Sequence, residues 1–194
     1  MSSITWMEAA LRKNGLRVRK VKGWKTRERP GTFAPRGVMF HHTTSGRSDG
    51  NAPLLGFVVE GDVDATPPLY GPLCNVLVAR NGTAFLVAAG RASHAGAGGP
   101  WRNIPEDSGN AYLIGVEVEN DGVGEPWSSE LLQACDVVFA TLLLGLGRRS
   151  GWLVSHKEWA PGRKSDPYCI DMTKYRRRVS DEMRTLAQVD LPPR

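Results

Sequence analysis

Cysteine is scarce in this sequence, and the three that occur, Cys74, Cys135 and Cys169, form no Cys-x-x-Cys pair. An odd number without that spacing excludes a disulfide framework and a four-cysteine zinc site, and it indicates a reducing compartment. Long apolar runs are also missing. The longest, residues 137–146, is too short to cross a bilayer, and residues 1–15 lack the apolar core of a signal peptide. We therefore expect neither membrane insertion nor secretion by the general pathway.

Acidic residues are nearly absent from one segment near the N-terminus. Between Arg12 and Arg29 there are nine lysines and arginines and one acid, Glu28. A second basic run covers residues 174–178, and the formal net charge is +5. Such a concentration of basic residues favours a polyanionic partner, although a solvated basic face explains it equally well. No nucleic-acid motif or zinc-finger spacing occurs, so we do not expect a nucleic-acid partner.

The order of apolar patterns predicts an α/β fold with a central mixed β-sheet flanked by helices. A chain of 194 residues with 41% hydrophobic residues is expected to form a single domain, here with a basic N-terminal arm at about residues 1–30. We expect a monomer. Strands are expected at residues 37–42, 111–120 and 151–156, and helices at 5–13, 53–60, 128–145 and 171–188. The segment "CNVLVARNGTAFLVAA" predicts a β-hairpin with a type I′ turn at Asn81-Gly82.

Two of the predicted strands end in a histidine. "GVMF" runs into His41, and "GWLVS" runs into His156. Ligands gather at the carboxyl ends of strands in open α/β sheets, so these two histidines could converge, and Asp166 follows a short loop later. Two histidines and one carboxylate, with a fourth position open to water, are the ligands of a catalytic zinc site. The simpler alternative for each histidine is a hydrogen-bonded structural residue.

Four motifs in a fixed order carry a family resemblance over roughly residues 35–185. They are "GVMFHHTTSG", "GRASHAG", "IGVEVEN" and "SHKEWAPGRKSDP". In this order they resemble the zinc-dependent N-acetylmuramoyl-L-alanine amidases of the type 2 family, which includes cell-wall recycling enzymes, phage endolysins and peptidoglycan recognition proteins. The resemblance implies a Zn²⁺ cofactor and a peptidoglycan substrate, and it makes an anionic cell-wall surface the expected partner of the basic segment.

The resemblance also implies a set of metal ligands. His41 would be the first ligand, His156 the second and Asp166 the third. His42 is an alternative to His41, but adjacent strand residues point to opposite faces, so both cannot bind the same ion. Cys169 is an alternative third ligand because some members of the family use a cysteine there, although it lies three residues beyond the expected position.

The catalytic residues implied by the resemblance are Glu117 and Lys164. Glu117 occupies the place of the catalytic carboxylate in the recycling enzymes, and Glu119 on the same face is its alternative. The carboxylate would move protons between water and the leaving amine, and Lys164 would stabilise the developing oxyanion. Many relatives carry a Tyr-His pair where this chain has Cys74-Asn75, which favours a mechanism based on Glu117 over one assisted by tyrosine.

Two further residues are expected to bind substrate. His94 matches a family histidine that lies near the cleft without binding metal, and a structural loop role is its alternative. Trp101 belongs to a glycine-rich loop, residues 95–110, that lacks the Gly-Lys-Ser/Thr of a phosphate-binding loop. We expect this loop to line the groove for the glycan and peptide, with Trp101 stacking on substrate.

The function implied by the resemblance is hydrolysis of the amide bond between N-acetylmuramic acid and L-alanine in peptidoglycan. We expect the catalytic domain of a phage endolysin, which stays in the host cytoplasm until lysis and then acts on the cell wall. The alternatives are a bacterial recycling amidase and a non-catalytic peptidoglycan-binding protein of the same fold. Because all three ligand positions are filled, the non-catalytic alternative is disfavoured.

Overall fold

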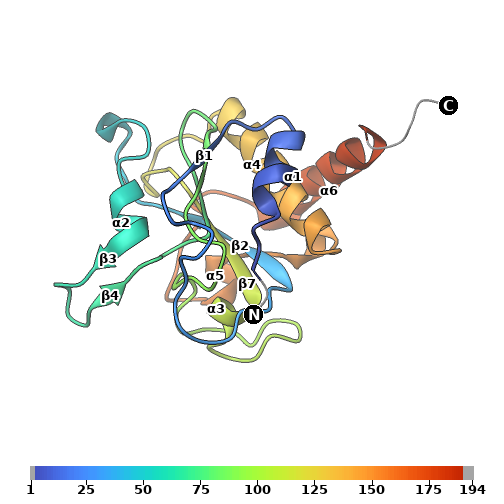
Figure 1. Cartoon of the computed structure of the whole chain (residues 1–194). Coiled ribbons are helices and arrows are strands. Elements are labelled where there is room, and N and C mark those ends of the chain that lie inside the picture. The colour runs from blue at the N-terminus through green and yellow to red at the C-terminus, as the bar shows by residue number, and fades with distance from the viewer. Residues whose placement is uncertain (1–2, 190–194) are drawn as a thin grey trace.

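The computed structural model describes residues 3–189, and a six-stranded sheet lies at its centre (Figure 1). Its strands are β1 (Val18–Lys20), β2 (Gly37–His42), β5 (Val76–Val78), β6 (Ala84–Leu86), β7 (Leu113–Val118) and β8 (Leu153–Ser155). Their order in the sheet is β1-β6-β5-β7-β2-β8. β5 and β6 pair antiparallel, and all other neighbours pair parallel. The predicted α/β fold with a central mixed sheet is therefore confirmed.

The strand β2 is buried on both faces, which explains its unbroken apolar sequence. Successive side chains alternate between the faces of the sheet. Phe40 belongs to the core cluster under the long helices, whereas Met39 belongs to a second cluster on the opposite face. His41 is two residues beyond Met39 and therefore shares its face.

Three helices cover one face of the sheet: α1 (Met7–Lys13), α4 (Ser129–Gly145) and α6 (Met172–Val189) (Figure 1). They lie close to the predicted ranges. Ser128 caps α4 by accepting a hydrogen bond from the amide of Leu131 at 3.2 Å. Phe40 of β2 packs against two of these helices: its ring centroid lies 4.7 Å from that of Phe139 in α4 and 5.3 Å from that of Tyr175 in α6.

The opposite face carries shorter elements. They are α2 (Leu55–Glu60), the paired strands β3 (Gly61–Asp62) and β4 (Leu69–Tyr70), α3 (Gly109–Tyr112) and α5 (His156–Trp159). The chain also forms the 3-10 turns η1 (Arg47–Asp49) and η2 (Ser150–Trp152), and η2 contacts α6 and α4. Val58 and Val59 of α2 pack on Leu77 and Phe85 of the sheet. β3 and β4 extend from α2 away from the body of the molecule (Figure 1), in a stretch where the sequence predicted no strand.

The β5–β6 hairpin is present, but its turn differs from the prediction. The amide of Gly82 donates to the carbonyl of Ala79 at 2.8 Å, and the amide of Ala79 donates to the carbonyl of Thr83 at 3.0 Å. Gly82 has a φ of 73°, while Asn81 is not among the residues of positive φ. A type I′ turn needs positive φ at both central positions, so the predicted type I′ turn at Asn81-Gly82 is wrong. This is a three-residue connection in which glycine takes the left-handed position.

The basic N-terminal segment is built into the domain. α1 packs on α4, and β1 forms one edge of the six-stranded sheet by pairing with β6. Ile4, Met7, Leu11 and Val18 all belong to the main core cluster. None of the helices within residues 3–189 is long and apolar enough to cross a membrane.

Candidate active site

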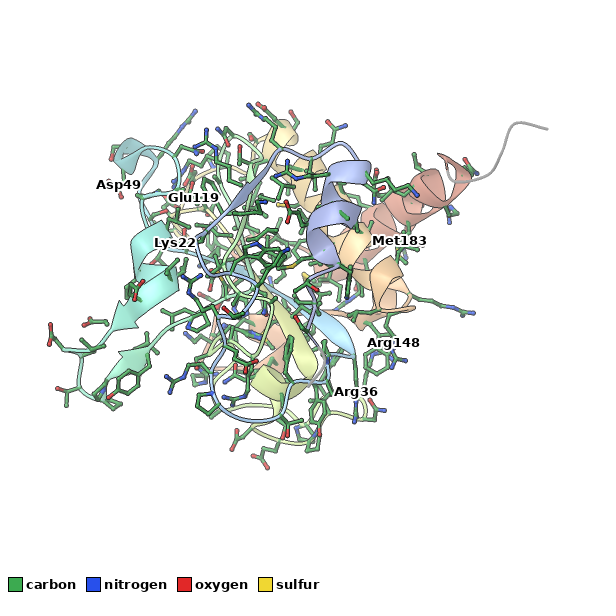
Figure 2. The ribbon with its side chains drawn as sticks, in the orientation of Figure 1. Lys22, Arg36, Asp49, Glu119, Arg148 and Met183 are labelled. Carbon is green, nitrogen blue, oxygen red and sulfur yellow. The ribbon has the colours of Figure 1, made fainter. Side chains whose placement is uncertain are left out.

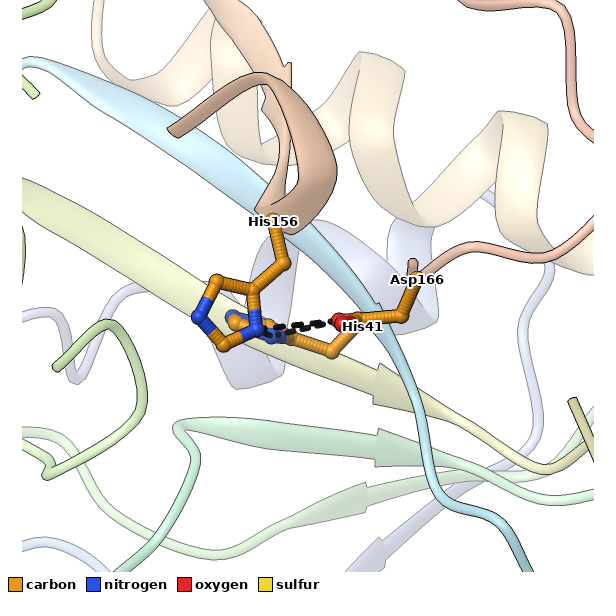
Figure 3. Close-up of side chains that lie close together, drawn as sticks. All are labelled: His41, His156 and Asp166. Atoms are coloured by element: carbon orange, nitrogen blue, oxygen red, sulfur yellow. Dashed lines mark hydrogen bonds and ion pairs between the residues drawn. The ribbon is translucent and has the colours of Figure 1, made fainter. Parts of the chain in front are cut away.

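Three side chains from separate segments meet at the carboxyl end of the sheet (Figure 3). His41 is near the end of β2, and His156 follows β8, the parallel neighbour of β2. Asp166 comes from the loop after α5. The Nδ1 atoms of His41 and His156 lie 2.9 Å apart, and Oδ2 of Asp166 is 3.1 Å from the first and 3.0 Å from the second. All three residues are buried, so the structure brings together the three ligand positions that the sequence singled out.

The hydrogen bonds behind the two histidines assign their tautomers. Nε2 of His156 lies 2.9 Å from the carbonyl oxygen of Ala95, which can only accept, so this nitrogen carries the proton. Nε2 of His94 likewise donates to the carbonyl of Leu113 at 3.1 Å. A neutral His94 therefore presents a lone pair on Nδ1, which accepts from Nε2 of His41 at 3.0 Å. In neutral His41 and His156, Nδ1 keeps a lone pair that faces the centre of the group.

This arrangement fits a bound cation. Two imidazole lone pairs and a carboxylate oxygen face one another with no proton to share, and a positive charge between them relieves their repulsion. Burial lowers the pKa of His41 to about 4, so its ring is neutral at pH 7. The atoms available as metal ligands are two nitrogens and one oxygen, a set that zinc accepts.

Glu117 lies beside this group. β7 and β2 pair in parallel with Glu117 opposite His41, and Oε1 of Glu117 is 4.0 Å from Nδ1 of His41. Its other oxygen, Oε2, is buried with no hydrogen-bond partner among residues 3–189. Burial raises the pKa of Glu117 well above its ordinary value; the charge of Asp166 adds to the rise, and the charge of Lys164 opposes it. A carboxyl pKa raised in this way is characteristic of groups that transfer protons in active sites.

Glu119, the alternative to Glu117, is engaged elsewhere (Figure 2). Its side chain is fully buried, and Oε2 accepts a hydrogen bond from the backbone amide of Arg80 at 3.1 Å. The guanidinium of Arg80 lies 3.6 Å from the same oxygen and forms a two-pronged ion pair with Glu125. Glu119 is therefore part of an ion-pair network that holds the loop after β7.

The alternative ligands also lie outside the group. Nδ1 of His42 accepts a hydrogen bond from the backbone amide of Tyr168 at 3.0 Å, which ties the end of β2 to the loop that carries Asp166. Cys169 is exposed and is not a member of the cluster. Lys164 is exposed, and its positive charge acts on both His41 and Glu117. Its ammonium group forms no hydrogen bond or ion pair with another residue in the described part of the chain, although its backbone amide donates to the carbonyl of Ala160 at 3.0 Å.

His94 is buried behind His41, and both of its ring nitrogens bond to the protein. Its backbone is held in place by Asn110, whose Oδ1 accepts hydrogen bonds from the amides of His94 and Ala95, each at 2.8 Å. Arg163 donates a further hydrogen bond to the carbonyl of Ala95 at 2.9 Å. The roles of Asn110 and Ala95 were not predicted, because these residues carry no local sequence signal. Arg163 lies within the motif "SHKEWAPGRKSDP", but the sequence assigned it no role.

Trp101 is not brought to the group. Its ring packs edge-on against Trp152 with centroids 5.8 Å apart. Trp152 precedes β8, so it lies at the amino end of the strand whose carboxyl end leads to His156. The guanidinium of Arg102 lies 5.1 Å from the Trp101 ring. A contact between Trp101 and substrate stays a prediction, and the packing supplies a structural role for this side chain.

Comparison with known protein families finds one family that matches the part of the chain that forms this site. A sequence model of the N-acetylmuramoyl-L-alanine amidases matches residues 31–169, a span that contains all three members of the buried group. The chain belongs to the N-acetylmuramoyl-L-alanine amidase family. This membership confirms the family and the enzyme activity that the four sequence motifs implied. A search of curated proteins finds no match to the chain.

Solved structures of amidases share the fold at low sequence identity. A selenomethionine derivative of AmpD has a TM-score of 0.62 and 20% identity, over 84% of this chain and 93% of that one. AmiD from E. coli, solved with anhydro-N-acetylmuramic acid-L-Ala-D-gamma-Glu-L-Lys, has a TM-score of 0.58 and 19% identity, over 79% and 61%. The Ph2119 endolysin from a Thermus scotoductus bacteriophage has a TM-score of 0.53 and 16% identity, over 84% and 99%.

Proposed function

We propose that this amidase is a zinc hydrolase that cleaves the amide bond between the lactyl group of N-acetylmuramic acid and L-alanine. The observation that carries the proposal is the convergence of two imidazole lone pairs and one carboxylate oxygen within 2.9 to 3.1 Å of one another, with Glu117 beside them. His41, His156 and Asp166 would hold the ion and leave a fourth position for water or substrate, as in catalytic zinc sites. Zinc held there supplies Lewis-acid activation of the scissile carbonyl and of the attacking water.

Glu117 is assigned the proton transfers. It takes a proton from the water that attacks the carbonyl carbon, and it returns a proton to the nitrogen of L-alanine as the carbon–nitrogen bond breaks. The support for this role is its position opposite His41 and its raised pKa. Cys74 stands where many relatives have a tyrosine, and burial raises the pKa of this thiol, with the charge of Glu117 adding to the rise. Cys74 therefore remains a neutral thiol and competes poorly for the role.

Lys164 is assigned the stabilisation of negative charge on the carbonyl oxygen. Its ammonium group is exposed and unpaired within the described residues, and its charge reaches His41 and Glu117. An exposed, unpaired positive charge near the group is free to approach the oxyanion as it develops.

His94 is assigned a positioning role in place of a substrate contact. By accepting from Nε2 of His41, it fixes the tautomer in which Nδ1 of His41 is a free ligand atom. Its own orientation is fixed by the carbonyl of Leu113 and by the carboxamide of Asn110.

We propose further that the enzyme acts on intact cell walls as a phage endolysin, reaching the wall from the host cytoplasm at lysis. The basic segment at residues 12–25, with seven lysines and arginines and no acid, supports a substrate within an anionic polymer. A recycling amidase acts instead on small soluble muropeptides. Rates on purified walls and on soluble anhydromuropeptides distinguish the two, and a strong preference for the soluble substrate would contradict the endolysin assignment.

The bond cleaved is tested by mass analysis of wall digests. The proposal predicts new free L-alanine amino termini and no new reducing sugars. New reducing sugars would show a glycosidase and overturn the proposal.

A further inference from the structure

A cavity of about 320 Å³ lies at the edge strand β1, apart from the buried histidine group. Its polar lining comes from Arg12, Arg17, Arg19, Asn51, Asn81 and Thr83, and no acidic residue is among the lining residues. We call this cavity the arginine pocket. Three of its lining residues are arginines, and an anion is the natural ligand for such a lining.

Two of the three arginines are held in place by the protein. Nη2 of Arg12 donates to the carbonyl of Val18 at 2.8 Å, and Nη2 of Arg17 donates to the carbonyl of Asn81 at 2.8 Å. A guanidinium has five N–H donors, so most donors of both groups remain free for a ligand. Anchoring also lowers the entropy lost when a ligand binds.

The charge of the pocket is only partly neutralised. Glu8 lies 3.4 Å from Nε of Arg12 and 3.1 Å from Nζ of Lys20, so one acid is shared between two bases. Arg17 and Arg19 form no ion pair with another residue in the range 3–189. They are two residues apart along an extended segment and therefore point to the same face.

The strand register places the pocket in line with the catalytic group. Arg19 pairs with Phe85, Phe85 with Leu77, Leu77 with Glu117, and Glu117 with His41. These five residues form one row across the sheet on a common face. Four interstrand steps of about 4.8 Å separate its ends by roughly 19 Å. This distance is short enough for a polymer attached to the glycan to contact the pocket while the stem peptide of the glycan lies at the histidine group. Because α2 covers Leu77 and Phe85 between them, the polymer passes outside α2.

We propose that the arginine pocket binds phosphate groups of a phosphodiester polymer of the bacterial cell wall and thereby holds the enzyme on its substrate. This inference rests on the proposed function as a wall amidase. Arginine binds phosphate oxygens in a two-pronged manner, and the Asn51, Asn81 and Thr83 side chains offer partners for polyol hydroxyls. The other cations of residues 12–25 add long-range attraction that weakens with salt.

The alternative polyanion, a nucleic acid, fits the surface less well. Proteins that bind single strands without sequence preference stack bases on exposed aromatic rings. The one aromatic residue of segment 12–25 is Trp24, which is only 4% exposed, and Phe85 of the pocket is only 8% exposed. The pocket therefore offers charge and hydrogen bonds without a stacking platform.

The test compares two double variants of equal charge change. R17Q/R19Q removes two pocket cations, and K22Q/K25Q removes two exposed cations that follow β1 and do not line the pocket (Lys22 is labelled in Figure 2). Binding is measured by cosedimentation with purified Gram-positive walls and with the same walls after hydrofluoric acid has removed their phosphodiester polymers. Each protein is also assayed on a soluble muropeptide, which reports folding and catalysis independently of the wall.

Wild-type protein and K22Q/K25Q are expected to bind intact walls roughly 10-fold more tightly than stripped walls, and R17Q/R19Q is expected to lose this difference. The slope of log affinity against log salt should fall by about two for R17Q/R19Q. Equal losses in both double variants, or equal wild-type binding to both walls, would overturn the proposal. Tighter binding to a 20-nucleotide DNA, lost in R17Q/R19Q, would assign the pocket to nucleic acid. If wild-type protein releases L-alanine amino termini from neither the walls nor the soluble muropeptide, the proposed function fails instead.

Discussion

Replacing His94 by alanine should weaken zinc binding although His94 is not a ligand. In the native arrangement, Nε2 of His41 donates to Nδ1 of His94 at 3.0 Å, and this bond leaves Nδ1 of His41 free. In His94→Ala, the buried Nε2–H loses its acceptor, so the tautomer with a proton on Nδ1 becomes competitive and the metal-facing lone pair is lost. Removal of such a partner typically costs about 10- to 100-fold in metal affinity, or about 1.4 to 2.7 kcal/mol.

The assay is a competition between the protein and a chelating dye for zinc, combined with ¹⁵N NMR of the histidine rings in metal-free protein. The NMR spectrum of the wild type should show a protonated Nε2 and a bare Nδ1 for His41. His94→Gln serves as the matched control, because its carboxamide can accept from His41 and donate to the carbonyl of Leu113. We expect His94→Gln to restore most of the affinity that His94→Ala loses.

Gly115 offers an independent way to disturb the same ring. A Cβ atom at this position would lie 2.5 Å from Cγ of His94, so Gly115→Ala must displace the ring and should also weaken zinc binding. If His94→Ala binds zinc as tightly as the wild type and the His41 tautomer is unchanged, the positioning role is wrong. In that case His94 is free to serve as the substrate contact that the sequence resemblance implied.

Further predictions concern the remaining residues of the site. Glu117→Gln should still bind zinc and fold, but its turnover should fall roughly 10²- to 10⁴-fold, whereas Glu119→Gln should retain turnover. The reverse result would show that Glu119 is the catalytic carboxylate. Asp166→Ala and His41→Ala should lose zinc together with activity, whereas His42→Ala should retain stoichiometric zinc; metal analysis of the three purified variants decides. In metal-free protein, burial penalises the charged form of Glu117, so the folded state binds its proton more tightly than the unfolded state does. The stability of the folded state should therefore fall as pH rises from the ordinary carboxyl pKa toward the raised one. The melting temperature of Glu117→Gln should exceed that of the wild type at pH 8 and equal it at pH 4. Equal melting temperatures at pH 8 would contradict this.

The sequence predicted the strands and the residues at their ends because these depend on local patterns. An apolar strand that runs into a histidine, as at His41 and His156, can be recognised from a few residues. The alternation of side chains along β2 separates His41 from His42 for the same reason. These local signals placed both histidines at one edge of the sheet.

The hydrogen bonds that hold the site histidines in place could not be predicted, because they depend on contacts between distant segments. The acceptors for His156 and His94 are backbone carbonyls of Ala95 and Leu113, and any residue type supplies a carbonyl. Trp101 was predicted to contact substrate because it belongs to a glycine-rich loop, and this contact stays a prediction; the packing of its ring against Trp152 could not be seen in the sequence. The hairpin turn was mistaken for a related type because an Asn-Gly pair occurs in both.

The most direct test of the account is the activity of metal-free protein on purified walls as zinc is added. The account predicts no release of L-alanine amino termini without zinc, a rise in rate up to one equivalent, and a plateau beyond it. Full activity in the metal-free protein, or a rise that continues to two equivalents, would contradict the assignment of one catalytic zinc to His41, His156 and Asp166.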